Sequence, residues 1–162
     1  MKKFFILFAV IIAFTFSNLN AKSSTMVGAG LGYGTKIENI AIQVGAVFDI
    51  DAPVKIAPDF KYYFTGNEFV TWWEINANAH YYLTKEKGTN FYLLGGLQYA
   101  NITVDYGTIF GASASASSGK IGLNVGAGAN FDLGGFNLMP ELKFTLGGNE
   151  QLHIGVSAMF PI

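Results

Sequence analysis

The two histidines, His80 and His153, are the residues best suited to acid–base chemistry near neutral pH. An enzyme that modifies a lipid needs such a base, or a nucleophile, on the surface that meets the lipid. Both histidines instead share a face with charged side chains, and Thr71 is the only hydroxyl besides the tyrosines on the apolar face. Their spacing resembles no set of metal ligands. We therefore expect no catalysis, no metal and no other cofactor, and we expect both histidines to form hydrogen bonds.

A second possible site is the run Gly28-Ala29-Gly30-Leu31-Gly32-Tyr33-Gly34, which could be mistaken for a phosphate-binding loop. The dinucleotide fingerprint needs a different glycine spacing and a helix that follows it. Glycine at every second position instead indicates a strand with no side chains on one of its faces. That face leaves room for bulky side chains from across a lumen. The candidates for that bulk are Tyr63, Trp72, Tyr82, Tyr92 and Met139.

Both observations belong to a period of two residues, which is clearest from 40 to 50. One face there carries Ile40, Ile42, Val44, Ala46, Phe48 and Ile50, and the other carries Ala41, Gln43, Gly45, Val47 and Asp49. Because successive side chains of a strand point to opposite faces, this period predicts strands between two unlike environments. The period recurs at 27–33, 54–64, 69–83, 91–99, 121–131, 136–146 and 152–160. About eight strands of roughly ten residues predict an all-β fold, an eight-stranded antiparallel up-and-down transmembrane β-barrel.

The apolar face is predicted to point outward, because the interior of an eight-stranded barrel is only just wide enough to be filled by side chains. Rings such as Phe60, Trp73 and Phe144 would overfill it, whereas the other face is rich in glycine. The charged residues also lie on the glycine-rich face rather than the apolar one. This is expected for a membrane barrel, because a lysine on the lipid face at mid-bilayer destabilises the fold by about 2–4 kcal/mol. The polar network expected in the lumen comprises Asp49, Lys55, Asp59, Lys61, Glu74, His80, Lys120, Glu141, Lys143 and His153.

The N-terminus has the pattern of an export signal. Lys2 and Lys3 precede an apolar run at 4–16, and Ala21 ends the polar segment that follows. This run is shorter than the roughly 20 residues of a membrane-spanning helix, so we predict a secretory signal peptide at 1–21 and an outer-membrane β-barrel domain at 22–162. The absence of cysteine excludes a lipoprotein anchor and disulfides. A net charge of −1 gives no indication of a nucleic-acid partner.

The first strand is expected to begin on the periplasmic side, next to the cleaved signal peptide. Periplasmic turns are then predicted at 51–53, 84–90 and 132–135, and outer loops at 35–39, 65–68, about 105–119 and 147–150. Three of the outer loops are too short to carry a sizeable binding surface. The loop at 105–119 is low in complexity, and we predict a flexible cap with Tyr106, Ile109 and Phe110 as its only candidate contact residues.

Aromatic residues of the apolar face gather at two levels, as expected for the two interfaces of a membrane. A general preference of strands for aromatic residues would explain their number but not these levels. The outer girdle is predicted to contain Tyr33, Tyr62, Phe64, Phe69, Tyr99 and Phe144, and the periplasmic girdle Phe48, Tyr81, Phe91, Phe131, Phe136 and Phe160.

The turns predict how neighbouring strands are aligned. Two-residue turns are expected at Gly66-Asn67 and Leu133-Gly134, and a tight turn at 51–53. Pro58 and Pro140 fall inside strands of a closed sheet, so each predicts a β-bulge or a register shifted by one residue. The facing pairs that follow are Asp49 with Lys55, Phe60 with Trp73, and Gly126 with Glu141, and Lys61 should lie diagonal to Glu74.

The lumen charges have two interpretations: they could line a small aqueous path, or they could pair with one another and plug the barrel. Opposed charges such as Asp49 and Lys55, and large residues facing glycine, favour the plug in so narrow a barrel.

Three segments carry a resemblance to a known family: 28–33, 122–131 and the closing strand 152–160. They resemble the small outer-membrane β-barrel family of Gram-negative bacteria, of the OmpX-like and porin-family kind. The resemblance implies a monomer in the outer membrane, surrounded by outer-membrane lipid and inserted by the barrel-insertion machinery with periplasmic chaperones. The last residue of the family is usually an aromatic that this machinery reads, whereas here Phe160 is followed by Pro161 and Ile162.

We therefore predict a barrel with a side-chain-filled lumen and a structural or surface-interaction role, without catalysis. A low-flux channel for small solutes is the alternative, and a lipid-modifying outer-membrane enzyme is the third possibility.

Overall fold

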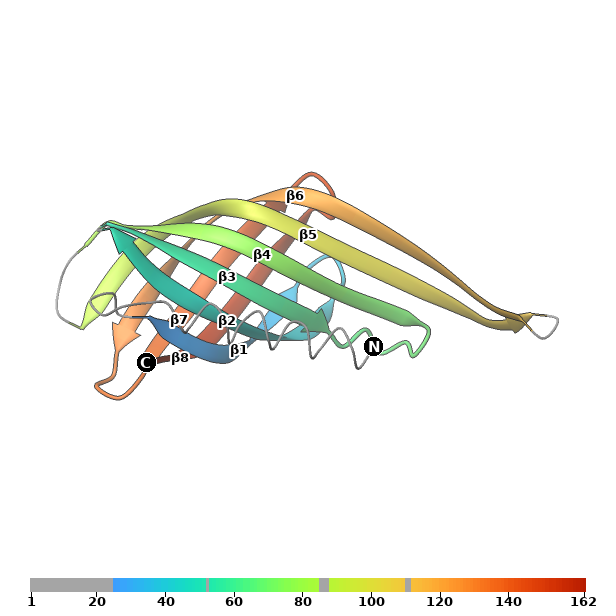
Figure 1. Cartoon of the computed structure of the whole chain (residues 1–162), viewed down its shortest axis with the longest axis horizontal. Helices are drawn as coiled ribbons and strands as arrows, with labels where there is room; N and C mark the ends of the chain where they lie inside the picture. The colour runs from blue at the N-terminus through green and yellow to red at the C-terminus, as the bar shows by residue number, and fades with distance from the viewer. Residues whose placement is uncertain (1–24, 52, 85–87, 110–111) are drawn as a thin grey trace.

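The computed structural model describes residues 25–51, 53–84, 88–109 and 112–162, which form one closed antiparallel β-barrel (Figure 1). The strands follow one another around the barrel in chain order, and β1 closes the sheet against β8. They are β1 (Met26–Gly34), β2 (Asn39–Asp51), β3 (Val54–Tyr63), β4 (Val70–Tyr82), β5 (Thr89–Ile109), β6 (Ala112–Asp132), β7 (Asn137–Leu146) and β8 (Gln151–Pro161). The predicted eight-stranded up-and-down barrel is confirmed, and the predicted signal peptide at 1–21 lies outside the described residues. Within the described ranges no helix is long and apolar enough to span a membrane.

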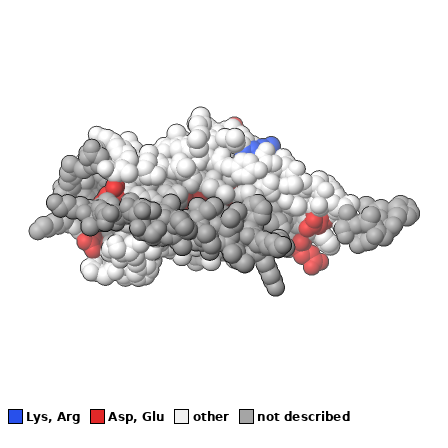
Figure 2. All heavy atoms as spheres, viewed as in Figure 1, with Lys and Arg blue, Asp and Glu red and all other residues white. Residues whose placement is uncertain are grey.

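The period of two in the sequence produces two unlike faces. On β6, Val125 is 46% exposed and its neighbour Asn124 is 1% exposed. On β2, Ile42 is 43% exposed and Ala41 is fully buried. Large apolar side chains therefore cover the outside of the barrel, while polar and small ones point inward. In Figure 2, the part of the barrel surface that is visible beside the grey atoms carries few charged side chains, as a lipid-facing surface requires.

The two longest strands, β5 and β6, continue beyond the barrel as a β-hairpin, here called the extension (residues 101–109 and 112–119; Figure 1). The outer loop predicted at about 105–119 is therefore wrong, because residues 105–109 and 112–119 continue these two strands. The two strands pair from Asn101 opposite Gly119 to Ile109 opposite Ala112, with one register shift between Asp105 and Thr108. Alanine and serine favour strands weakly by themselves, but continuous pairing with β5 overrides that weak preference.

The three residues expected to make contacts in that loop have different positions. Tyr106 is exposed on β5, and Ile109 is the last residue of the same strand. Phe110 lies outside the described residues.

The alignment across two turns differs from the prediction by two residues. Lys61 lies directly opposite Glu74 and Tyr62 opposite Trp73, because the turn between β3 and β4 is wider than Gly66-Asn67. Leu133 N donates to Phe136 O at 3.0 Å, so the turn between β6 and β7 is Gly134-Gly135 rather than Leu133-Gly134. Gly126 consequently faces Lys143, and Glu141 faces Gly128. The predicted pairing of Asp49 with Lys55 is confirmed.

Neither internal proline marks a bulge. On β3, Gly45 still pairs with Asp59 and Phe48 with Ile56, so the register is the same on both sides of Pro58. The ladder to β2 is only interrupted there, because proline has no N–H to donate. Pro140 interrupts the ladder between β6 and β7 in the same way, without a shift of register.

Candidate functional site: the barrel lumen

The lumen contains three layers of inward-pointing side chains. An apolar cluster lies at the predicted periplasmic end, a polar layer occupies the middle, and a smaller aromatic cluster lies at the predicted outer end. Tyr63, Trp72, Tyr82, Tyr92 and Met139, the candidates for bulk opposite glycine, are each at most 8% exposed. The first cluster comprises Met26, Val47, Ala57, Tyr82, Tyr92, Leu94, Met139 and Met159, and the second comprises Ala41, Tyr63 and Trp72 with Ile37 and Ile102 packed against it.

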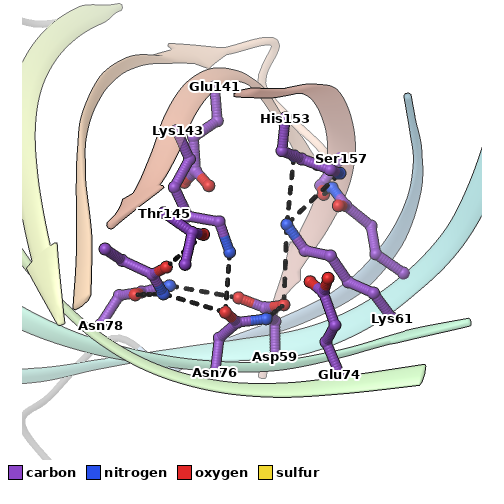
Figure 3. Close-up of polar contacts among 12 residues, drawn as sticks. Asp59, Lys61, Glu74, Asn76, Asn78, Glu141, Lys143, Thr145, His153 and Ser157 are labelled. Atoms are coloured by element: carbon purple, nitrogen blue, oxygen red, sulfur yellow. Dashed lines mark hydrogen bonds and ion pairs between the residues drawn. The ribbon is translucent and has the colours of Figure 1, made fainter. Parts of the chain in front are cut away.

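Amides and a lysine connect strands across the middle layer (Figure 3). Asn124 Nδ2 donates to Asn76 Oδ1 at 2.9 Å and to Asn78 Oδ1 at 2.8 Å, and its Oδ1 accepts from Thr145 at 2.9 Å. Lys143 Nζ donates to the same Asn76 oxygen at 2.7 Å. The side chains of Asn76, Lys143 and Thr145 are fully buried, so these contacts hold β4, β6 and β7 together across the lumen.

Asp59 joins this network to a second lysine. Its two carboxylate oxygens accept from Asn76 Nδ2 at 2.9 Å and from Asn78 Nδ2 at 3.2 Å, and Lys61 Nζ lies 3.8 Å away. Lys61 also contacts both ring nitrogens of His153, at 3.2 and 3.4 Å. A Cβ on Gly32 would collide with the imidazole of His153. This ring therefore fits in the lumen because β1 carries glycine at that inward position.

Glu74 is the fully buried carboxylate nearest the predicted outer end. It accepts from Gln151 Nε2 at 2.8 Å, from Trp72 Nε1 at 3.2 Å and from the Tyr63 hydroxyl at 3.4 Å. Neutral donors thus surround this carboxylate, and the aromatic cluster is attached to the polar layer.

His80 and Glu141 border a cavity of about 50 Å³. The ring of His80 stacks on Tyr92 with centroids 4.3 Å apart, and Tyr92 donates its hydroxyl to Glu141 Oε2 at 3.3 Å. His80 Nε2 lies 3.7 Å from the same carboxylate oxygen, and neither ring nitrogen of His80 forms a hydrogen bond, so the hydrogen bonds predicted for this histidine are not observed. Ser157, which accepts from Gln43 Nε2 at 2.6 Å, also lines this cavity. Among the described residues, no three side chains of His, Cys, Asp or Glu form a group able to hold a metal.

The remaining predicted lumen residues lie apart from the central network. Asp49 and Lys55 form an ion pair at 2.6 Å toward the predicted periplasmic end, where Lys55 Nζ also lies 4.9 Å from the centre of the Tyr82 ring. Lys120 is exposed near the base of the extension, so the structure does not bring it together with the other charged residues.

Most of the predicted girdle residues lie on the outer surface. Tyr33, Tyr62, Phe64, Phe69, Tyr81, Phe91, Tyr99, Phe144 and Phe160 are exposed, and Phe48, Phe131 and Phe136 are half-buried. Trp73, which was not assigned to a girdle, connects two of the outward-facing aromatic residues: its ring centroid lies 6.2 Å from that of Phe60 and 5.7 Å from that of Tyr99.

The residues that the sequence pattern did not reveal are the neutral members of the network. Asn76, Asn78, Asn124, Thr145 and Gln151 supply most of its hydrogen bonds. They carry no charge, and only their place on the same face as the charged residues could have indicated them.

The comparisons with known proteins agree with this architecture. The family described as "Outer membrane protein beta-barrel domain" matches residues 8–158. No curated protein is similar enough in sequence to match the chain.

Several solved structures share the fold at low identity. The N-terminal β-barrel domain of Pseudomonas aeruginosa OprF is 17% identical with a TM-score of 0.69, over 87% of this chain and 100% of that one. Neisserial surface protein A is 16% identical with a TM-score of 0.65, over 88% and 99%. Ail, the attachment invasion locus protein of Yersinia pestis, is 14% identical with a TM-score of 0.58, over 86% and 96%. These identities establish similarity of fold alone.

Proposed function

Because the chain belongs to the outer membrane protein β-barrel domain family, we propose that it is a monomeric, non-conducting barrel of a Gram-negative outer membrane with a structural or surface-interaction role. It is exported through a cleaved signal peptide, inserted by the barrel-insertion machinery with periplasmic chaperones, and surrounded by outer-membrane lipid. It carries out no catalysis and needs no cofactor.

The packing of the lumen is the observation that supports a closed barrel. The middle layer is crossed by hydrogen bonds from β4 to β6 and β7, and the clusters around Tyr92 and Tyr63 lie at its two ends. A continuous water path through this layer would separate Asn76, Asn124 and Lys143, whose buried polar groups are hydrogen-bonded across the lumen. Each buried polar group left without a partner costs about 1–3 kcal/mol, so an open state would be sparsely populated.

The extension supports a role at the surface. Three of the four outer connections are short, whereas β5 and β6 continue well beyond the other strands. An element that stands clear of the membrane on a rigid barrel suits contacts with the surroundings of the cell better than a mobile loop does.

The low-flux channel remains the second candidate, because the cavity beside His80 and Glu141 is space inside the lumen that side chains do not occupy. A lipid-modifying enzyme is the third candidate. It is disfavoured because His80 and His153, the only histidines of the chain, are both buried inside the barrel and cannot reach a lipid.

Conductance of the purified protein in planar bilayers tests the proposal. We expect insertion without stable current steps. The matched control is the variant Tyr82→Ala/Tyr92→Ala, which removes two rings from the apolar cluster and should conduct. Heat-dependent migration in SDS gels shows whether each protein is a folded barrel. Reproducible unitary currents from the unchanged protein would refute the closed barrel, and an altered lipid A mass spectrum in a deletion strain would indicate an enzyme.

A further inference from the structure

The outward side of the extension has a polar surface that continues the lipid-facing side of the barrel. One row of hydroxyl groups crosses three strands, since Thr71 on β4 pairs with Thr103 on β5, and Thr103 pairs with Ser117 on β6. Asn101 lies in the row below and Ser115 in the row above. We call Thr71, Asn101, Thr103 and Ser117 the hydroxyl face, and Ser115 borders its upper edge.

The position of this face is determined by the strands beneath it. Tyr99 and Ile121, one row below Asn101, are 40% and 70% exposed on the apolar outside of the barrel. Because side chains two residues apart on a strand share one side, the hydroxyl face lies directly above this lipid-facing surface. The change from apolar to polar occurs between Tyr99 and Asn101, at the level of the predicted outer girdle. A partner bound to the hydroxyl face would therefore lie directly above the lipid tails that cover Tyr99 and Ile121. That position is the level of the lipid headgroups.

The side chains of the hydroxyl face both donate hydrogen bonds to one another and accept them. Asn101 Nδ2 donates to Ser117 Oγ at 3.0 Å, and Thr103 Oγ1 donates to Asn101 Oδ1 at 3.2 Å. Each hydroxyl still has a further lone pair or proton for an outside partner. The face thus matches a partner that also carries closely spaced hydroxyl groups.

An aromatic platform borders the lower edge of the hydroxyl face. The rings of Trp73 and Tyr99 pack with centroids 5.7 Å apart. A Cβ on Gly119 would collide with the phenol of Tyr99, so this glycine lets the ring lie against β6 just below Ser117. An amphipathic ring beside a row of hydroxyls can cover the apolar side of a sugar ring while the hydroxyls bind its rim.

The charge of the outer end indicates which part of a headgroup fits. Lys36 and Lys120 are outnumbered there by Glu38, Glu68, Asp105 and Glu150, which gives 2 − 4 = −2 among these residues. Lys120 also alternates onto the opposite side of β6, away from the hydroxyl face. Phosphate or sulfate groups would be repelled, whereas a neutral sugar would not.

We propose that the hydroxyl face binds the neutral saccharide portion of glycolipid headgroups in the outer leaflet, as a docking surface that anchors the extension in the sugar layer. The inference rests on the proposed orientation of the barrel in an outer membrane. It assigns the extension a lipid-linked partner rather than a free ligand or a protein.

The test uses the absence of cysteine from the chain, which allows one spin label to be placed at Ser115→Cys. The full protein is reconstituted in three kinds of vesicle: phosphatidylcholine alone, phosphatidylcholine with lipopolysaccharide that carries a complete core, and phosphatidylcholine with lipid A that carries only its inner acidic sugars. Electron paramagnetic resonance measures label mobility as the glycolipid fraction is raised. We expect immobilisation only with the complete core.

Two variants in this labelled background separate the hydroxyl face from the rest of the extension. Thr103→Val/Ser117→Val removes two hydroxyls and should raise the glycolipid fraction needed for half-maximal immobilisation about tenfold, since each lost hydrogen bond weakens binding by a few-fold or more. Ser118→Val lies opposite Ile102 on the other side of the same strand and should change nothing.

Equal mobility in all three vesicles would overturn the inference, and so would equal immobilisation by the truncated lipid A, which would indicate binding to phosphate or to the membrane surface. Unchanged immobilisation in Thr103→Val/Ser117→Val would also overturn it. Gel migration and circular dichroism of the same samples report insertion of the barrel. A protein that does not insert would refute the proposed function and this inference together, whereas an inserted barrel with a mobile label would refute this inference alone.

Discussion

Replacing Asp59 with asparagine should destabilise the folded barrel more than replacing Asp49, although Asp49 forms the shorter ion pair. Asp49 and Lys55 meet at 2.6 Å, but their side chains are 31% and 22% exposed. Asp59 and Lys61 lie 3.8 Å apart, with side chains 20% and 1% exposed. Burial rather than distance should therefore decide which pair contributes more to stability.

The magnitude follows from the contacts of Asp59. Two unit charges 3.8 Å apart attract by roughly 4 kcal/mol at an effective dielectric constant of about 20. A hydrogen bond to a charged group contributes about 1.5–3 kcal/mol, and an asparagine at position 59 could not accept from both Asn76 and Asn78 as the carboxylate does. Lys61 keeps Glu74 opposite it on β4, which offsets part of the loss. We expect Asp59→Asn to lower the free energy of unfolding by about 2–4 kcal/mol.

Two double-mutant cycles measure the difference. One combines Asp59→Asn with Lys61→Met, and the other combines Asp49→Asn with Lys55→Met. Urea unfolding of barrels in lipid vesicles, followed by tryptophan fluorescence, gives the stability of each variant. The interior coupling energy should be about 2 kcal/mol or more, because Lys61→Met removes the buried charge that Asp59→Asn leaves behind. The coupling energy at the rim should be at most about 1 kcal/mol.

A rim pair that couples as strongly as the interior pair would refute this reasoning. So would a double variant Asp59→Asn/Lys61→Met that is no more stable than Asp59→Asn alone, because Lys61 would then not need its carboxylate.

Two further substitutions test the outside and the inside of the barrel with matched controls. Val125→Lys places a charge on the exposed apolar surface at mid-membrane and should lower the free energy of unfolding in vesicles by about 2–4 kcal/mol. Ser115→Lys, on the same side of β6 but on the extension, should lower it by almost nothing. Equal stabilities of the two variants would contradict the assignment of the lipid face. Gly128→Ala would drive a methyl group into the ring of Tyr92 and should cost about 1–3 kcal/mol, whereas Gly135→Ala has open space around it and should be nearly neutral. A neutral Gly128→Ala would mean that Tyr92 does not pack against β6.

The barrel and its two faces could be predicted because the period of two is strong in most strands. Exposed Ile42 beside buried Ala41 on β2, and exposed Val125 beside buried Asn124 on β6, follow the alternation of the sequence. The pairing of Asp49 with Lys55 was predictable for the same reason. The turn between them is short, and the alternation of side chains along each strand places both residues on the inward face.

The extension and two of the alignments could not be predicted in the same way. Residues 112–117 alternate alanine with serine, a contrast too weak to separate an outward from an inward face without the partner strand. Across Leu133-Gly134-Gly135, a turn at either dipeptide keeps every side chain on its correct face, because the two alternatives differ by two residues. The alternation of side chains therefore could not show whether Glu141 or Lys143 faces Gly126, because both residues point inward.

Aqueous and lipid access to single cysteines tests the central claim, a barrel with an apolar outside and a lumen filled by its own side chains. Thr145→Cys is the inward probe, Val125→Cys the lipid-facing probe and Ser115→Cys the probe on the extension. A charged methanethiosulfonate reagent should modify only Ser115→Cys at an appreciable rate, and a lipid-soluble nitroxide should quench a fluorophore only at Val125→Cys. Thr145→Cys should be reached by neither, because Thr145 is fully buried. Rapid modification of Thr145→Cys by the charged reagent in a folded barrel would contradict the account and demonstrate an aqueous path through the lumen.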